Sequence, residues 1–108
     1  MAYSQTRDTM TRTDGSTPGR NITLITPDDA NDLATYPKAL RVYVPAAISE
    51  ATLRVTPARA AAEANAADQT PSVLLKFPSG VTVEPLQVRK VWAADLTAGG
   101  VVVHGYGD

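Results

Sequence analysis

Few residues of this 108-residue chain have the types and spacing that enzyme chemistry requires. His104 is the single histidine, and a catalytic nucleophile needs a nearby base that is itself oriented by a third group. No serine lies in a G-x-S-x-G elbow, and neither a G-x-G-x-x-G segment nor a Walker loop is present. We therefore expect His104 to be a structural residue, and the protein to have no enzymatic activity and no cofactor.

Three aspartates, Asp28, Asp29 and Asp32, form a small acidic cluster. A calcium loop of the EF-hand type also needs a glycine at its sharp turn and a distal glutamate, and this segment has neither. Thr26 and Pro27 are instead the residue types that begin helices, and aspartates favour the positive end of a helix dipole. The segment therefore predicts a short helical turn and no metal site.

Composition restricts the class of protein. The formal net charge is −1, the isoelectric point is near 5.7 and there is no cysteine. Proteins that bind nucleic acid are usually basic, and without cysteine no disulfide can form. No apolar run approaches the roughly 18–20 residues of a membrane span, and the N-terminus lacks the apolar stretch of a secretory signal. We expect a protein made in the cytoplasm, without nucleic-acid or membrane partners.

The apolar residues predict a single domain with a thin core. They make up 44% of the chain, but only 6% of the residues are aromatic. Small side chains bury little area each, at about 25 cal/mol per Å², and a chain of this length buries only about two thirds of its unfolded surface. Association with further copies is a common way to complete such a core.

Alternating apolar side chains predict an all-β fold. The strands 38–44 and 51–56 follow each other and are predicted to form a hairpin. The fold we expect is a small antiparallel β-sandwich, jelly-roll-like, with the short helical turn described above. Strands are expected at 21–25, 38–44, 51–56, 73–77 and 86–94, with a last strand beginning at 101–103.

The stretch 73–95 is the centre of the predicted fold, with the only Phe and the only Trp of the chain, Phe77 and Trp92. A tight turn is expected at 78–80 between two strands. Alternation is imperfect near Arg89, so either a β-bulge changes the phase of the strand there or both of its faces are covered. The alanine-rich segment 58–70 is expected to be a surface loop or a short, loosely docked helix.

Residues 1–20 are polar and contain no regular period, which separates an N-terminal segment from the β-sandwich domain at 21–108. This segment is either a disordered tail or an extended arm that orders on a neighbouring subunit. In the second case, Arg7, Arg12 and Arg20 would supply charge-assisted hydrogen bonds to that neighbour.

The order of motifs resembles a known family. The chain contains I-T-P-D-D-A-N-D-L, Y-P-K-A-L-R-V-Y-V, T-L-R-V-T and V-L-L-K-F-P-S-G-V-T-V-E-P-L-Q-V-R-K-V-W in this order. This arrangement, over residues 24–103, is similar to the small head-spike base proteins of gene transfer agents and related tailed phages.

The resemblance implies a virion structural protein, made in the bacterial host, at capsid vertices. The implied partners are further copies of the chain, with a pentamer favoured over a trimer, the major capsid protein and a spike fibre protein. Trp92 and the arm residues Arg7, Arg12 and Arg20 are the expected interface residues, because Trp and Arg are enriched where interfaces carry most of their energy. Alternatives are a capsid decoration or cement protein, a tail component and, more remotely, a carbohydrate-binding module that uses exposed tyrosines.

Overall fold

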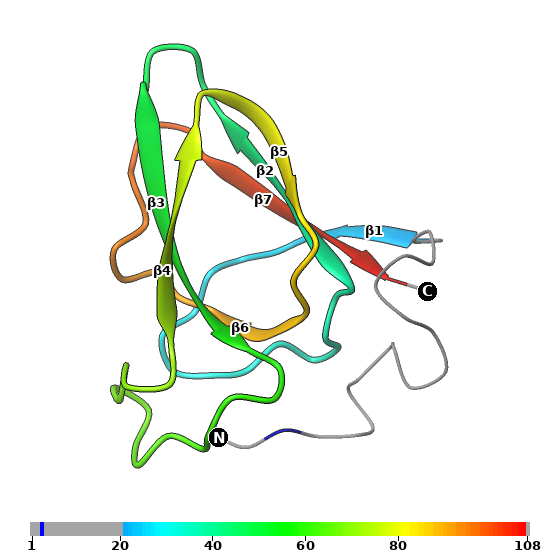
Figure 1. The fold of residues 1–108 in the computed structure, drawn as a ribbon, viewed down its shortest axis with the longest axis vertical. Coiled ribbons are helices and arrows are strands. Elements are labelled where there is room, and N and C mark those ends of the chain that lie inside the picture. The colour runs from blue at the N-terminus through cyan, green and yellow to red at the C-terminus, as the bar shows by residue number, and fades with distance from the viewer. Residues whose placement is uncertain (1–2, 4–20, 108) are drawn as a thin grey trace.

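The computed structural model describes Tyr3 and residues 21–107. Apart from Tyr3, the predicted arm, including its three arginines, lies outside the described residues. The described part is all-β, with two packed antiparallel sheets (Figure 1), which confirms the predicted β-sandwich. One sheet has the strand order β1-β7-β2-β5 and the other β4-β3-β6. The strands are β1 (Asn21–Leu24), β2 (Ala39–Val44), β3 (Glu50–Pro57), β4 (Val73–Pro78), β5 (Gly80–Glu84), β6 (Val88–Val91) and β7 (Val102–Gly107).

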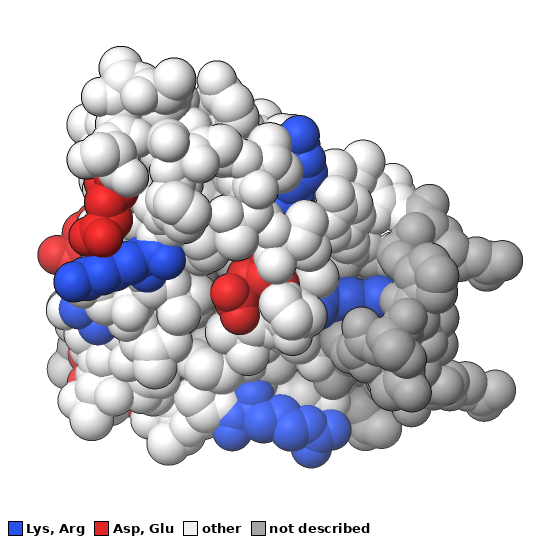
Figure 2. All heavy atoms as spheres, turned by 45° about the horizontal axis from the view of Figure 1, so that its top comes forward, with Lys and Arg blue, Asp and Glu red and all other residues white. Residues whose placement is uncertain are grey.

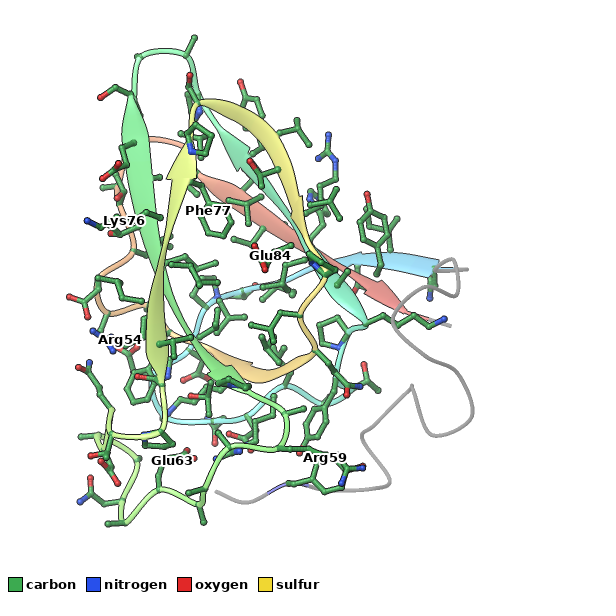
Figure 3. The ribbon with its side chains drawn as sticks, viewed as in Figure 1. Arg54, Arg59, Glu63, Lys76, Phe77 and Glu84 are labelled. Carbon is green, nitrogen blue, oxygen red and sulfur yellow. The ribbon has the colours of Figure 1, made fainter. Side chains whose placement is uncertain are left out.

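The core lies between the sheets and is built from alternate residues of the strands. In β2 the buried residues are Leu40, Val42 and Val44, and in β3 the same period buries Leu53 and Val55. These are the faces that the alternation predicts. Phe77 of β4 points into the space between the two sheets (Figure 3) and is 2% exposed. Most core side chains are valine or leucine, so the core is apolar but thin.

The predicted hairpin of strands 38–44 and 51–56 is wrong. β2 lies between β7 and β5 in one sheet, whereas β3 is the middle strand of the other. The connection begins with a turn in which Ile48 N donates to Pro45 O over 3.0 Å. Period 2 reports which face of a strand is buried but not which strand is its neighbour. Both edges of β2 and of β3 are used by strands from later in the chain.

The short helical turn expected around residues 26–29 does not form, and the described residues contain no helix. The segment instead runs beside the edge of β6. Asp28 N donates to Val91 O over 2.9 Å, and Leu33 N donates to Arg89 O over 2.7 Å. These bonds satisfy backbone groups at an otherwise open strand edge, so tertiary pairing overrides the local helix signals.

The stretch 73–95 forms three strands rather than two. The turn at 78–80 is present, with Gly80 at φ +103°, a conformation that favours glycine. It carries the chain from β4 in one sheet to β5 in the other. The long strand predicted at 86–94 is limited to β6, Val88–Val91, because the chain leaves the sheets after β5 at a segment that contains Pro85.

Two alternatives were expected for the strand near Arg89, a β-bulge or coverage of both faces, and the structure shows both. Thr56 pairs with Lys90 and Pro57 pairs with Val88, so Arg89 is the extra residue on β6. The bulge allows Val88 and Val91 to enter the core together, although their spacing breaks strict alternation. Both faces of β6 are covered, and all four of its residues are buried.

Gly105 of β7 provides a test of how tightly the first sheet is packed. A Cβ added there would lie 2.8 Å from Pro37 Cβ and 3.0 Å from Ile25 Cδ1. We expect Gly105→Ala to lower the free energy of unfolding by about 1–3 kcal/mol, because the neighbours must shift. Gly107→Ala on the same strand is the control, since its added Cβ meets nothing within 4 Å. Equal urea midpoints for the two variants would contradict this account.

Candidate functional site

His104 lies on β7, and its paired neighbours among the described residues are not acidic. Its cross-strand neighbours are Leu24 and Arg41, and its buried Nδ1 has no hydrogen-bond partner. A general base needs an orienting acceptor on its second nitrogen. Among the described residues no group of three or more His, Cys, Asp or Glu side chains could hold a metal ion. Within the part of the chain that the structure describes, no group therefore orients the imidazole of His104 through its Nδ1.

Asp28 and Asp29 accept hydrogen bonds from backbone amides. Asp28 Oδ1 accepts from Ala30 N over 2.7 Å, and this hydrogen bond is the main cause that lowers the Asp28 pKa. Asp29 Oδ1 accepts from Ala93 N over 2.8 Å and from Ala94 N over 2.9 Å. Asp29 thus joins its loop to the chain that leaves β6.

A buried charge cluster, defined as Arg89, Asp32 and Glu63, lies where three distant segments meet. Their side chains are 0%, 1% and 1% exposed. Arg89 Nε lies 3.5 Å from Asp32 Oδ2, and Arg89 Nη2 donates to Glu63 Oε1. A guanidinium presents a planar fork of donors, so one side chain can serve several acceptors. Arg89 also donates to the backbone carbonyls of Pro57, Ala58, Ala60 and Ala61.

The two carboxylates of the cluster have different electrostatic environments. Burial raises the pKa of Asp32, and repulsion from Glu63 raises it further, against the opposing charge of Arg89. Burial is the largest single influence on Glu63 and acts to raise its pKa, but the hydrogen bond from Arg89 and the attraction of nearby positive charge together outweigh it, so this pKa is below the ordinary value. Removal of one partner from such a buried ion pair is costly, because the other charge then stays buried without compensation. The cluster therefore attaches the loop after β3 to strand β6.

Trp92, predicted as an interface residue, is 1% exposed in the isolated chain. Its Nε1 donates to Thr56 Oγ1 over 3.0 Å. The Lys90 ammonium lies 3.6 Å from the centre of the Trp92 ring and donates to Ala66 O over 3.1 Å. Lys90 and Arg89 thus attach the alanine-rich segment to β6 at two points, and that segment is a loop, as expected.

The loop 58–70 is also stabilised by hydrogen bonds within the loop itself. Asp68 accepts from Ala64 N over 2.9 Å and from Thr70 N over 3.0 Å. These hydrogen bonds, above all that of Ala64, lower the pKa of Asp68 to about 2. In Figure 3, Glu63 and Arg59 mark this loop at the lower end of the molecule.

The low pKa of Asp68 predicts a pH-dependent contribution to stability. Because the folded value lies below the ordinary 3.8, the carboxylate stabilises the fold above about pH 4 and loses this effect as the pH falls through about 2. Urea midpoints of the wild type and of Asp68→Asn should therefore differ at about pH 5 and converge at about pH 2. A constant difference across this range would show that Asp68 ionisation does not support the loop.

Tyr3, within the predicted arm, contacts this chain's own domain. Its ring lies 5.9 Å from that of Tyr36 and 4.4 Å from the Arg59 guanidinium carbon. Arg59 Nη2 also donates to the Tyr3 hydroxyl over 3.2 Å. Tyr36 itself is fully buried. An aromatic ring that packs against a second, tilted ring and against a guanidinium gains both apolar contact and cation–π attraction.

The surface in Figure 2 shows acidic and basic side chains in small separate groups, with no continuous basic patch on the face in view. Binding to phosphate backbones relies on clustered Lys and Arg. The described residues also contain no helix that is long and apolar enough to cross a membrane.

Sequence reasoning missed Arg89 as the centre of the buried charge cluster. The signal that points to it is a pair of cations inside the apolar run V-R-K-V-W. Charged side chains are almost never fully buried unless they are paired, so a strand with both faces covered required partners for Arg89 and Lys90.

The fold has a counterpart among solved structures. The chain is similar to one in a structure described as the capsid of a native GTA (gene transfer agent) particle computed with C5 symmetry. The TM-score is 0.56 and the sequence identity 20%, over 89% of this chain and 92% of that chain. No family model and no curated protein matches the sequence. At this identity the likeness shows a shared fold.

Proposed function

We propose that this chain is a non-enzymatic structural protein of a virion-like particle, of the kind formed by tailed phages and gene transfer agents. The observation that carries the proposal is the fold likeness to a chain of a GTA capsid over 89% of the length. The order of sequence motifs supports it independently. Among the described residues, the ionisable side chains discussed above either attach loops to the sheets or, as with His104, lack an orienting partner. This also favours a structural role.

The finer proposal is the base of a head spike at capsid vertices, which links the capsid to a spike fibre. Its partners are further copies of the chain in a vertex pentamer, the major capsid protein and the fibre protein. Arg7, Arg12 and Arg20 of the arm are proposed to bind a neighbour through charge-assisted hydrogen bonds. Because Trp92 is buried, its proposed part in the interface is to fix the conformation of the loops beside it.

A carbohydrate-binding role has less support. Sugar sites need exposed aromatic rings beside polar groups. Tyr36 is fully buried, and Tyr43, which is 41% exposed, has Val81 and Val102 as cross-strand neighbours. No binding on a glycan array is therefore expected.

Electron microscopy of particles made with and without this gene tests the position. Loss of density at the vertices, together with the fibres, is the expected result. Loss at three-fold positions or at the tail would replace the vertex assignment with a decoration or tail role. A chain that lacks residues 1–20 tests the arm in the same particles, and normal incorporation of it would overturn the proposed role of the arm.

A further inference from the structure

The outer face of the four-stranded sheet is apolar. We define the outer sheet face by Ile22 and Leu24 of β1, Arg41 and Tyr43 of β2, and Val81 and Val83 of β5. The strand register places them on one side, since Arg41 pairs with Val83, Tyr43 pairs with Val81, and His104 of β7 pairs with both Leu24 and Arg41. The residues that alternate with them on β2 are the buried core residues of this sheet.

The exposure of this face is unusual for a strand surface. Ile22, Leu24, Tyr43, Val81 and Val83 are 41–65% exposed, and they are five of the seven large apolar side chains of the described residues that are exposed. Neighbouring strands lie about 4.8 Å apart, so the four strands spread these side chains over about 14 Å. Single exposed apolar residues are ordinary, but a contiguous group marks an interaction surface.

Arg41 restricts which partner can cover this face. Its cross-strand neighbours are Val83 and His104, neither of which is acidic. No hydrogen bond or ion pair within the described part of the chain uses the Arg41 guanidinium. A partner that covered the face would remove water from this cation, which is costly unless an anion replaces the water. A guanidinium binds a carboxylate through two parallel hydrogen bonds.

Two copies packed face to face about a two-fold axis do not meet this requirement. Such an interface is self-complementary and brings the same patch of both copies together. It would therefore set Arg41 of each copy against residues of the same face in the other copy, and none of the residues that define this face carries a carboxylate. Charge complementarity thus favours a different surface as the partner.

We propose that the outer sheet face docks a partner protein whose apolar surface presents a carboxylate to Arg41. The apolar side chains supply the buried area, and the ion pair with Arg41 sets the orientation of the partner. The inference deepens the proposed function and rests on it for the source of the partner, the particle shell.

The experiment uses particles from a strain that lacks this gene, to which purified protein is added before sedimentation. Arg41→Glu is expected to weaken binding by about 30-fold or more, because it sets two carboxylates against each other. Lys76→Glu is the matched control, since Lys76 is exposed on β4 in the other sheet and the charge change is identical. Val81→Ser combined with Val83→Ser should weaken binding without a change in charge.

The outcomes separate the two proposals. Binding of the wild type and of Lys76→Glu, but not of Arg41→Glu, supports the docking face. Equal binding by the two charge variants overturns the docking face and leaves the particle role intact. Failure of the wild type to bind overturns the particle role. Sedimentation equilibrium on the protein alone tests whether a second copy occupies the face. If the wild type self-associates and Arg41→Glu abolishes this self-association, the occupant is a second copy. That result would overturn the proposal that a different protein docks there. Thermal unfolding checks that each variant is folded.

Discussion

Replacement of Arg89 by methionine is expected to lower the free energy of unfolding by about 3–5 kcal/mol. The Arg89 side chain is fully buried, and Asp32 and Glu63 beside it are 1% exposed. Without the guanidinium, two carboxylates remain buried without their cation, and four backbone carbonyls of the loop after β3 lose a donor. The expected effect is large because the penalty comes from the groups that are left behind.

Urea unfolding of Arg89→Met measures this effect. Arg41→Met is the matched control and should change the free energy of unfolding by no more than about 0.5 kcal/mol, because Arg41 is only half-buried and its guanidinium makes no hydrogen bond or ion pair within the described residues. Addition of Asp32→Asn and Glu63→Gln to Arg89→Met should restore part of the loss, since the stranded charges are then removed. Equal stability of Arg89→Met and Arg41→Met would show that the buried charge cluster does not hold the fold.

Trp92→Ala is expected to cost about 3–5 kcal/mol. The ring is 1% exposed, contacts the Lys90 ammonium and donates to Thr56. Trp92→Phe keeps most of the apolar volume and should cost less, because it loses chiefly the Nε1 hydrogen bond and part of the attraction to Lys90. The milder variant keeps the measurement possible if Trp92→Ala does not fold.

The same variants distinguish a structural Trp92 from one that acts only by contact with a partner. Tyr43→Ala on the outer sheet face is the control, since that aromatic side chain is 41% exposed. We expect Trp92→Ala to lower the urea midpoint strongly and Tyr43→Ala to lower it little. If Trp92→Ala kept wild-type stability and only lost association with particles, its role would be that of a surface contact.

From the sequence, the buried faces of the strands were predicted better than the pairing between strands. Alternation identified Leu40, Val42, Leu53 and Val55 as inward residues, because the side-chain period of a strand is local. The broken alternation near Arg89 indicated either a bulge or a strand covered on both faces, for the same reason. Pairing is not local: β2 and β3 share the same pattern, but different sheets contain them.

The helical turn expected around residues 26–29 failed because its signals are weak compared with tertiary pairing. A cap or a dipole effect is worth about 1 kcal/mol. The segment instead gains backbone hydrogen bonds to Val91 and Arg89 along the edge of β6. No local pattern contains the information that this edge is open.

The candidate sites were the least predictable part. Asp32, Glu63 and Arg89 come from three segments that meet only after the sheets form. The outer sheet face likewise depends on the order β1-β7-β2-β5, which brings Leu24 and Val83 onto one surface. The predicted arm arginines lie outside the described residues, so their role remains a prediction.

The central claim is that this chain belongs to a particle. Quantitative mass spectrometry of particles purified on a density gradient, from cells that carry the gene, tests it most directly. We expect the protein to sediment with the major capsid protein in a constant ratio across the particle fractions and to stay there after a high-salt wash. A protein found only in the soluble fractions, with particles complete without it, would contradict the account.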